Sequence, residues 1–170
     1  MTTTPEKRPV SSLIRATIFA SDLDRTTAFY NALGFTEVYY EGTLTDPSAS
    51  TIIGFQDHGP LKVRIVKSGG PNFGMLGLFQ IDPALTPDVL PPAKGPARIG
   101  EVAIIFYVRS MEKTLAALRA AGATWSPEPE LFVMAHRSQQ EVCLRDPDGV
   151  LINLVETDPD EQYLTGQEGV

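Results

Sequence analysis

Few side chains in this sequence have the chemistry of a catalyst, since it contains only two histidines and one cysteine. His58 lies in an Asp-His-Gly-Pro segment that predicts a hairpin turn and a solvent-exposed imidazole. His136 precedes a predicted strand at residues 141–145, where it is either a surface residue or a general acid or base toward a ligand. Cys143 lies within the apolar pattern of that strand, so we expect a buried and inert thiol.

Two carboxylates complete the set of reactive candidates. Glu101 lies two residues before Ala103 and therefore on the same face of a predicted strand, close to the apolar Ile105. Burial there raises the pKa of a carboxyl toward the range of a general base, whereas pairing with an arginine cancels the rise. Glu141 is a reserve acid, on a strand whose orientation the sequence does not fix.

Composition excludes several classes of partner. The net charge of −7 and the pI near 4.8 argue against a surface for nucleic acid or anionic membrane, which requires clustered basic side chains. The apolar run after Lys7 and Arg8 is interrupted by Arg15 and Asp22, which is wrong for a signal peptide, and no stretch approaches transmembrane length. With a single cysteine, these features predict a cytoplasmic protein.

The length and the distribution of glycine and proline predict five segments. The 170 residues suffice for one domain or two small packed modules. We expect a flexible leader at 1–10, modules at 11–67 and 99–157, a connector or flap at 68–98, and an acidic tail at 158–170. The connector is rich in Gly and Pro, and its apolar patch at 73–79 is either an extra strand or part of a flap.

The first module reads as a strand, a capped helix and further strands. A β-rich run at residues 13–20 is followed by Ser21, which can cap a helix, and Gly34 ends that helix as a left-handed residue. Strands are then predicted at about 36–40, 50–56 and 61–67, separated by turns that contain glycine.

The second module repeats the first. A shift of 88 residues aligns Leu23 with Met111 and Gly34 with Gly122, and it places Ser110 at the second helix cap. A shift of 89 aligns residues 61–67 with 150–156. The predicted fold class is therefore α+β, with tandem βαβββ modules that form a curved mixed sheet.

A tight turn supports a specific resemblance. Asp146-Pro147-Asp148-Gly149 has the proline and glycine that such a turn requires, and we expect both aspartates to bind nearby backbone amides. With the Ser-Asp-Leu-Asp-Arg segment before the first helix and the Phe-Tyr-Asn-Ala-Leu-Gly-Phe segment at its end, the chain resembles the vicinal-oxygen-chelate superfamily of glyoxalase I, bleomycin-resistance proteins and extradiol dioxygenases. The resemblance covers about residues 13–156 and implies that each module forms half of a ligand-binding cup.

The resemblance also implies a divalent metal, held by one residue in the first strand and one in the last strand of each module. These positions fall on Arg15, Arg64, Ala103 and Asn153. Arginine and alanine cannot coordinate a cation, and an asparagine oxygen is a weak ligand. We therefore expect no metal cofactor. If Arg15 and Arg64 both point into the cup, they form an anion site with Glu101 as the nearest acidic partner; alternatively, each arginine pairs at the surface.

Apolar side chains provide the remaining ligand-binding candidates. Phe19, Ile105 and Tyr107 share the cup-facing parity of their strands, which suits an aromatic or polyketide-like ligand, although core packing explains them equally well. Trp125 either stacks on a ligand or seals the helix end or a dimer contact.

Three functions remain open from sequence. The first is a metal-independent protein that binds a small organic ligand, anionic or aromatic, for sequestration or transport. The second is a metal-independent lyase or isomerase with Glu101 or His136 as base. The third is a divalent-metal-dependent lyase or dioxygenase with atypical ligands such as Glu101, His136 and Glu141. The resemblance also implies a homodimer, because the family commonly builds its cups across an interface.

Overall fold

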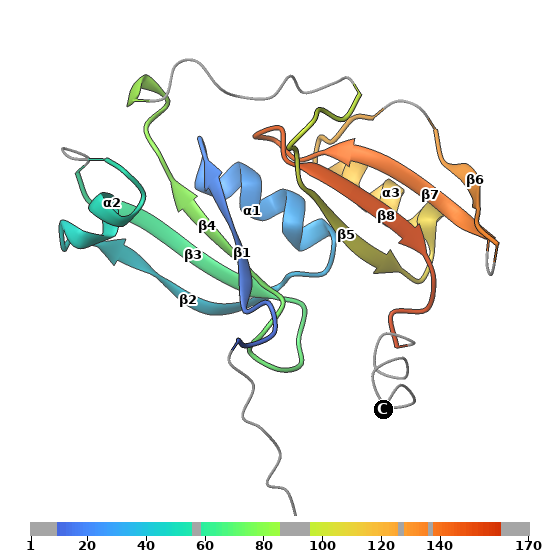
Figure 1. The fold of residues 1–170 in the computed structure, drawn as a ribbon, viewed down its shortest axis with the longest axis horizontal. Helices are drawn as coiled ribbons and strands as arrows, with labels where there is room; N and C mark the ends of the chain where they lie inside the picture. Colours follow the sequence, from blue (N-terminus) through green and yellow to red (C-terminus); the bar gives the residue numbers. More distant parts are fainter. Residues whose placement is uncertain (1–9, 56–58, 86–95, 126–127, 136–137, 161–170) are drawn as a thin grey trace, which may run out of the picture.

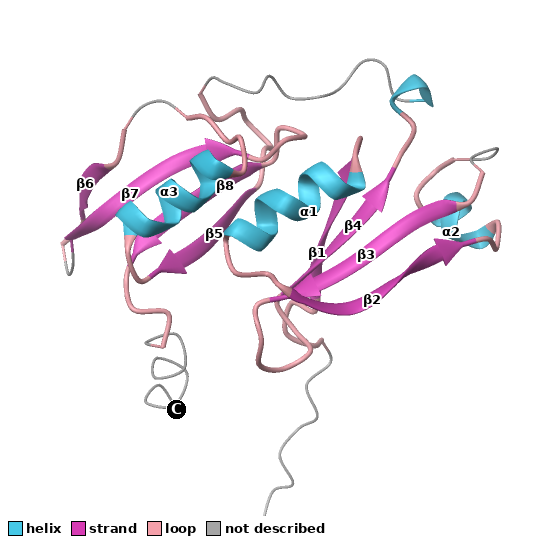
Figure 2. Ribbon diagram, turned by 180° about the vertical axis from the view of Figure 1, so that it is seen from behind, coloured by secondary structure: helices cyan, strands magenta, loops and turns pink. Residues whose placement is uncertain are grey.

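The computed structural model describes residues 10–55, 59–85, 96–125, 128–135 and 138–160. They form two four-stranded mixed sheets that lie side by side, with α1 and α3 behind them (Figures 1 and 2). The elements of the first unit are β1 Arg15–Ala20, α1 Leu23–Ala32, β2 Glu37–Leu44, α2 Ser48–Ile52, β3 Leu61–Lys67 and β4 Met75–Gln80, followed by the 3₁₀ turn Pro83–Leu85. Those of the second unit are β5 Ala103–Val108, α3 Met111–Ala120, β6 Glu130–Val133, β7 Ser138–Arg145 and β8 Leu151–Glu156.

The two sheets have the same topology. The first has the order β1-β4-β3-β2 and the second the order β5-β8-β7-β6, with a parallel pair at one edge of each. The shift of 88 residues is confirmed, because it relates β1 to β5 and α1 to α3 at both of their ends. The tandem βαβββ prediction is therefore correct.

The shift of 89 residues is wrong. It matched β3 with β8, but β4 occupies in the first sheet the place that β8 occupies in the second. Thr17 pairs with Gly77 as Ile105 pairs with Asn153, so Gly77 is the counterpart of Asn153. Both β3 and β4 are apolar runs, and only the hydrogen-bonded pairing distinguishes them. The patch at 73–79 is thus a strand, and the first sheet includes part of the segment predicted as a connector.

Residues 50–54 form the end of a helix and a turn, within the segment 50–56 for which a strand was predicted. Asp46 accepts a hydrogen bond from the Ser48 amide at 2.9 Å, and Pro47 supplies the backbone angle at the helix start. Gly54, with φ of 90°, follows its end. Ile53 and Phe55 then pack on a small core that includes Leu61, Val63, Ile65 and Met75, on the face of the first sheet opposite α1.

The helices are capped largely as predicted. Ser110 caps α3, and Gly34 and Gly122 follow the two helices with positive φ. The α1 cap differs, because Asp22 rather than Ser21 accepts hydrogen bonds from the first-turn amides, at 3.0 Å each. An ionised carboxylate is a strong acceptor at the positive end of a helix, which leaves Ser21 available for another contact. None of the described helices is long and apolar enough to cross a membrane.

The Asp146-Pro147-Asp148-Gly149 turn joins the two units. Asp146 accepts hydrogen bonds from the amides of Asp148 and Val150, as predicted for a local turn. Asp148 does not bond locally. Its carboxylate reaches α1, where it accepts hydrogen bonds from the Ser21 amide at 3.0 Å and the Thr26 hydroxyl at 2.6 Å.

A shared hydrophobic core lies behind the sheets. Tyr30 and Phe35 of the first unit belong to the same buried cluster as Leu118 and Leu154 of the second. Phe35 meets Phe106 edge to face, with ring centroids 5.2 Å apart. Each of α1 and α3 covers the back of its sheet. On the opposite face of the first sheet, the small core with Ile53 and Phe55 covers one part, and the part along β1 is left for a ligand. We call the faces opposite the helices the open faces; they carry Arg15, Thr17, Phe19, Gly77 and Phe79 on the first sheet, and Ala103, Ile105, Tyr107, Glu141, Cys143 and Asn153 on the second.

Candidate functional site

Arg64 lies outside the open face of the first sheet. In the ladder it pairs with Leu78, which is buried beneath α1, so its side chain points to the helix side. Its guanidinium contacts Asp24 at 3.1 Å and Glu41 at 2.5 Å, and the hydrogen bond to Glu41 raises the pKa of Arg64. These residues line a surface hollow of about 250 Å³. The alternative in which Arg15 and Arg64 face one cavity is therefore wrong, and Arg64 instead pairs with acidic side chains at the surface.

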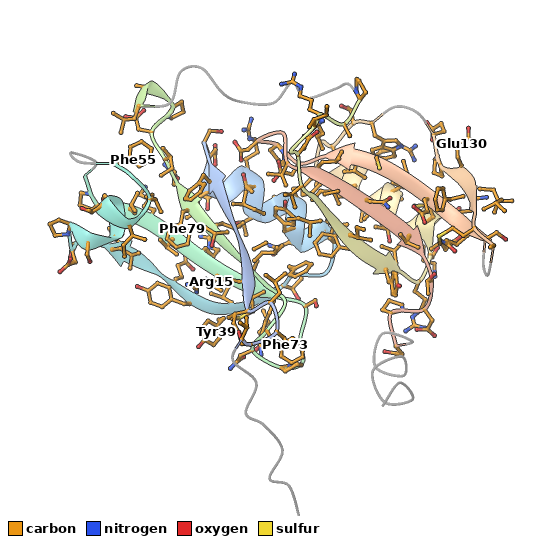
Figure 3. All side chains as sticks on the ribbon, viewed as in Figure 1. Arg15, Tyr39, Phe55, Phe73, Phe79 and Glu130 are labelled. Carbon is orange, nitrogen blue, oxygen red and sulfur yellow. The ribbon has the colours of Figure 1, made fainter. Side chains whose placement is uncertain are left out.

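Arg15 lies on the open face, and its side chain crosses the bare backbone of Gly77. A Cβ atom placed on Gly77 would lie 3.3 Å from Cδ of Arg15, 3.3 Å from the ring of Phe79 and 3.5 Å from Oγ1 of Thr17. No described acidic side chain forms an ion pair with Arg15. Figure 3 shows Arg15 between Phe79 and Tyr39 on the face of this sheet turned toward the viewer.

Aromatic side chains accompany this arginine. Phe19 remains 47% exposed and meets Phe79 edge to face, with ring centroids 6.3 Å apart. On the second sheet, Ile105 is 59% exposed and Tyr107 is half-buried on the same open face. These exposed and half-buried apolar side chains provide a surface for a ligand with an apolar body.

The open face of the second sheet carries a hydrogen-bonded carboxylate. The carboxylate of Glu141 accepts hydrogen bonds from the side-chain amide of Gln139 at 2.7 Å and from the side-chain amide of Asn153 at 3.0 Å. Oδ1 of Asn153 is buried and has no hydrogen-bond partner among the described residues. Cys143 pairs with Asn153 across the strands and is exposed, contrary to the expectation of a buried thiol, because its side chain points to the face without a helix. Partial burial raises the pKa of this thiol, so the thiolate is not favoured.

Glu101 is committed to an ion pair. Both of its oxygens accept hydrogen bonds from the buried guanidinium of Arg145, which also donates to the Gly149 carbonyl at 2.7 Å. These bonds, with that from the Arg98 amide, lower the pKa of Glu101 to about 2. A carboxyl with such a low pKa is a weak general base. Of the two alternatives for Glu101, the structure therefore has the one in which an arginine cancels the rise of its pKa.

Trp125 packs against the shared core, and the guanidinium of Arg119 lies 4.4 Å from the centre of its ring. Because this cation covers one ring face at the end of α3, the geometry agrees with the alternative in which Trp125 seals the helix end. His58 and His136 lie outside the described residues.

The four positions equivalent to the metal ligands are Arg15, Gly77, Ala103 and Asn153 once the strand register is corrected. Three of these lack any atom that can coordinate a cation, and Asn153 offers one neutral oxygen. The described residues contain no group of three or more His, Cys, Asp or Glu that could hold a metal. The donor set on the open faces therefore does not fit a divalent cation.

A family model described as Glyoxalase/Bleomycin resistance protein/Dioxygenase superfamily matches residues 12–154. The chain belongs to this superfamily. No curated protein matches its sequence. Members of known structure include a glyoxalase-family protein from Bacillus cereus, at 17% identity over 91% of this chain and 98% of that one, with a TM-score of 0.61.

Two further solved structures have the same fold. UcmS2 is 22% identical over 87% of this chain and 99% of its own, with a TM-score of 0.59. A glyoxalase-family protein from Enterococcus faecalis is 24% identical over 85% of this chain and 97% of its own, with a TM-score of 0.55. At such identities the likeness establishes the superfamily fold but no ligand.

Sequence reasoning missed Gly77 and Phe79 as residues of the open face. The apolar patch that contains them was recognised, but its alternation was not assigned to a strand. A signal was present, since Met75, Gly77 and Phe79 alternate with Leu76 and Leu78 at the period of a strand exposed on one side.

Proposed function

We propose that this superfamily member binds a small organic ligand with an aromatic or other apolar body on its open sheet faces, without a metal. The observation that carries this proposal is the exposed ring of Phe19, which meets the half-buried ring of Phe79 beside the corrected metal-ligand positions, where no cation ligand stands. Such a surface supports binding through apolar contact, and sequestration or transport requires nothing more.

Ligand screening by thermal shift tests this function. We expect aromatic acids, aromatic amides or aromatic antibiotics, rather than simple sugars, to stabilise the protein, by about 2.7 kcal/mol at a concentration one hundred times the dissociation constant. Phe19→Ala removes one ring of the aromatic pair and should raise the dissociation constant of a stabilising compound at least threefold.

Elemental analysis of protein purified without chelator should find far less than one equivalent of divalent metal, and EDTA should leave the ligand effect unchanged. Stoichiometric metal, or stabilisation by no aromatic compound, contradicts the proposal.

The enzymatic alternatives receive less support from the described residues. Glu101 is neutralised by Arg145, and Glu141 is held by two amide groups, so neither is poised to remove a proton. A metal centre built from Glu101, His136 and Glu141 would have to disrupt both arrangements. Turnover assays on any stabilising compound distinguish binding from catalysis.

We also propose a homodimer, as the resemblance to the family suggests. Three consecutive residues of the edge strand β6, Leu131, Phe132 and Val133, are 57%, 48% and 68% exposed. Apolar exposure on both faces of an edge strand is unfavourable in water, and a second copy can cover it. Sedimentation equilibrium should give twice the chain mass of 18.5 kDa. A monomer at micromolar concentration would refute this assembly.

A further inference from the structure

The arrangement of Arg15 over Gly77 specifies the charge of the ligand. We infer that Arg15 is the carboxylate-binding group of the open face and that Gly77 is the residue that positions it. This inference rests on the proposed function and narrows the ligand class to small aromatic carboxylates.

The cation is available for a ligand. Arg64, Arg25, Arg109, Arg119 and Arg145 each form an ion pair with an acidic side chain, whereas Arg15, like Arg98, forms none with a described residue. An exposed guanidinium without an acidic partner presents a planar fork of donors that matches a carboxylate in two parallel hydrogen bonds.

The absence of a side chain at residue 77 determines where this guanidinium lies. Cδ of Arg15 lies 3.3 Å from the point where a Cβ atom at Gly77 would stand, a contact tight enough that the arginine would have to shift to make room for it. The ring of Phe79 approaches the same point at the same distance. Glycine therefore lets the arginine lie flat on the sheet beside an aromatic ring.

In this arrangement a side chain, and not a metal ion, provides the positive charge. The position equivalent to Asn153 in the first unit carries no side chain, so β4 provides no donor atom there. Instead, the positively charged side chain of Arg15 reaches this position from the neighbouring strand β1. The positive charge of the guanidinium attracts an anion without a bound metal.

Matched pairs of ligands provide the test: benzoate and benzamide, phenylacetate and phenylacetamide, cinnamate and cinnamamide. Dissociation constants are measured by calorimetry or ligand-observed NMR on the full chain. We expect the carboxylate of at least one pair to bind at least fivefold more tightly than its amide. Arg15→Met should reduce this ratio to within twofold of unity and leave amide binding nearly unchanged. Arg109→Met, which removes a surface arginine paired with Asp158 and Asp160, controls for net charge and should preserve the ratio.

The positioning role of Gly77 has its own readout. Gly77→Ala should lower the ratio at least threefold because the new methyl group displaces Arg15, and it should have no further effect on the ratio when combined with Arg15→Met. Gly59→Ala, whose added methyl meets no atom within 4 Å, is the control and should change nothing. An equal effect of Gly77→Ala with and without Arg15 would refute positioning.

The two proposals fail in different ways. If amides and carboxylates bind equally and Arg15→Met changes neither affinity, the role of Arg15 as the carboxylate-binding group is wrong while the proposed function stands. If no compound of either charge binds, both the proposed function and the role of Arg15 fail.

Discussion

Asp148→Ala is expected to lower the free energy of unfolding by about 3–5 kcal/mol, because the substitution leaves buried donors without an acceptor. The carboxylate is 4% exposed and accepts hydrogen bonds from the Ser21 amide, the Ser21 hydroxyl, the Thr26 hydroxyl and the Arg25 guanidinium. Thermal unfolding should therefore occur about 10 °C lower than in the wild type.

Two further variants make this experiment specific. Asp148→Asn retains one acceptor oxygen and should cost less than Asp148→Ala. Asp82→Ala removes an exposed carboxylate whose one bond to a described residue is with the nearby Ala84 amide, and it should cost less than about 1 kcal/mol. A cost of Asp148→Ala as small as that of Asp82→Ala would mean that the turn does not join the two units.

Tyr30→Phe is expected to cost about 1–3 kcal/mol near neutral pH and to weaken the loss of stability at alkaline pH. The Tyr30 hydroxyl is fully buried and donates to Asp146 at 2.9 Å. Burial, followed by the charge of Asp146, raises the pKa of Tyr30 above its ordinary value of 10.0. Burial likewise raises the pKa of Asp146, and the hydrogen bond from the Tyr30 hydroxyl opposes this rise.

The sign of the pH dependence follows from these shifts. In the unfolded chain Tyr30 loses its proton near pH 10, whereas in the folded protein it keeps the proton to higher pH. Its contribution to stability is present below pH 10 and is lost as the pH rises above 10, by up to about 1.4 kcal/mol per pH unit. Phenylalanine removes this dependence.

Denaturant unfolding at pH 8, 10 and 10.5 measures this difference. The wild type should lose stability faster than Tyr30→Phe between pH 10 and 10.5. Tyr39→Phe, which alters a tyrosine that is 50% exposed, should follow the wild type. Parallel alkaline curves for the wild type and Tyr30→Phe would contradict the assignment.

Much of the fold could be predicted because its signals are local. Ser110 and the two glycines after the helices define helix ends through interactions within one turn of chain, and the shift of 88 residues follows from side chains that pack the same way in both units. The resemblance to the superfamily rests on such short segments and on their order.

The wrong predictions with the largest consequence for the site involve pairing across the sheet. Residues 61–67 and 75–80 are both apolar and strand-like, so the sequence could not show which of them lies beside β1. That choice moved Arg64 from the open face to the helix side and brought Gly77 to the position of interest. It is decided by hydrogen bonding between strands distant in sequence, and a displaced pairing moves side chains to the other face.

The sequence by itself therefore determined the paired modules, the cap of α3, the glycines that end both helices, the turn and the absence of good cation ligands at most positions of the family's metal site. Only the tertiary structure decided that Asp148 reaches α1, that Arg145 neutralises Glu101 and that Arg15 lies over Gly77. Local backbone preference and side-chain chemistry can be read from neighbouring residues. The charge and position of a binding group depend on residues that folding brings together, as the 127 positions between Ser21 and Asp148 illustrate.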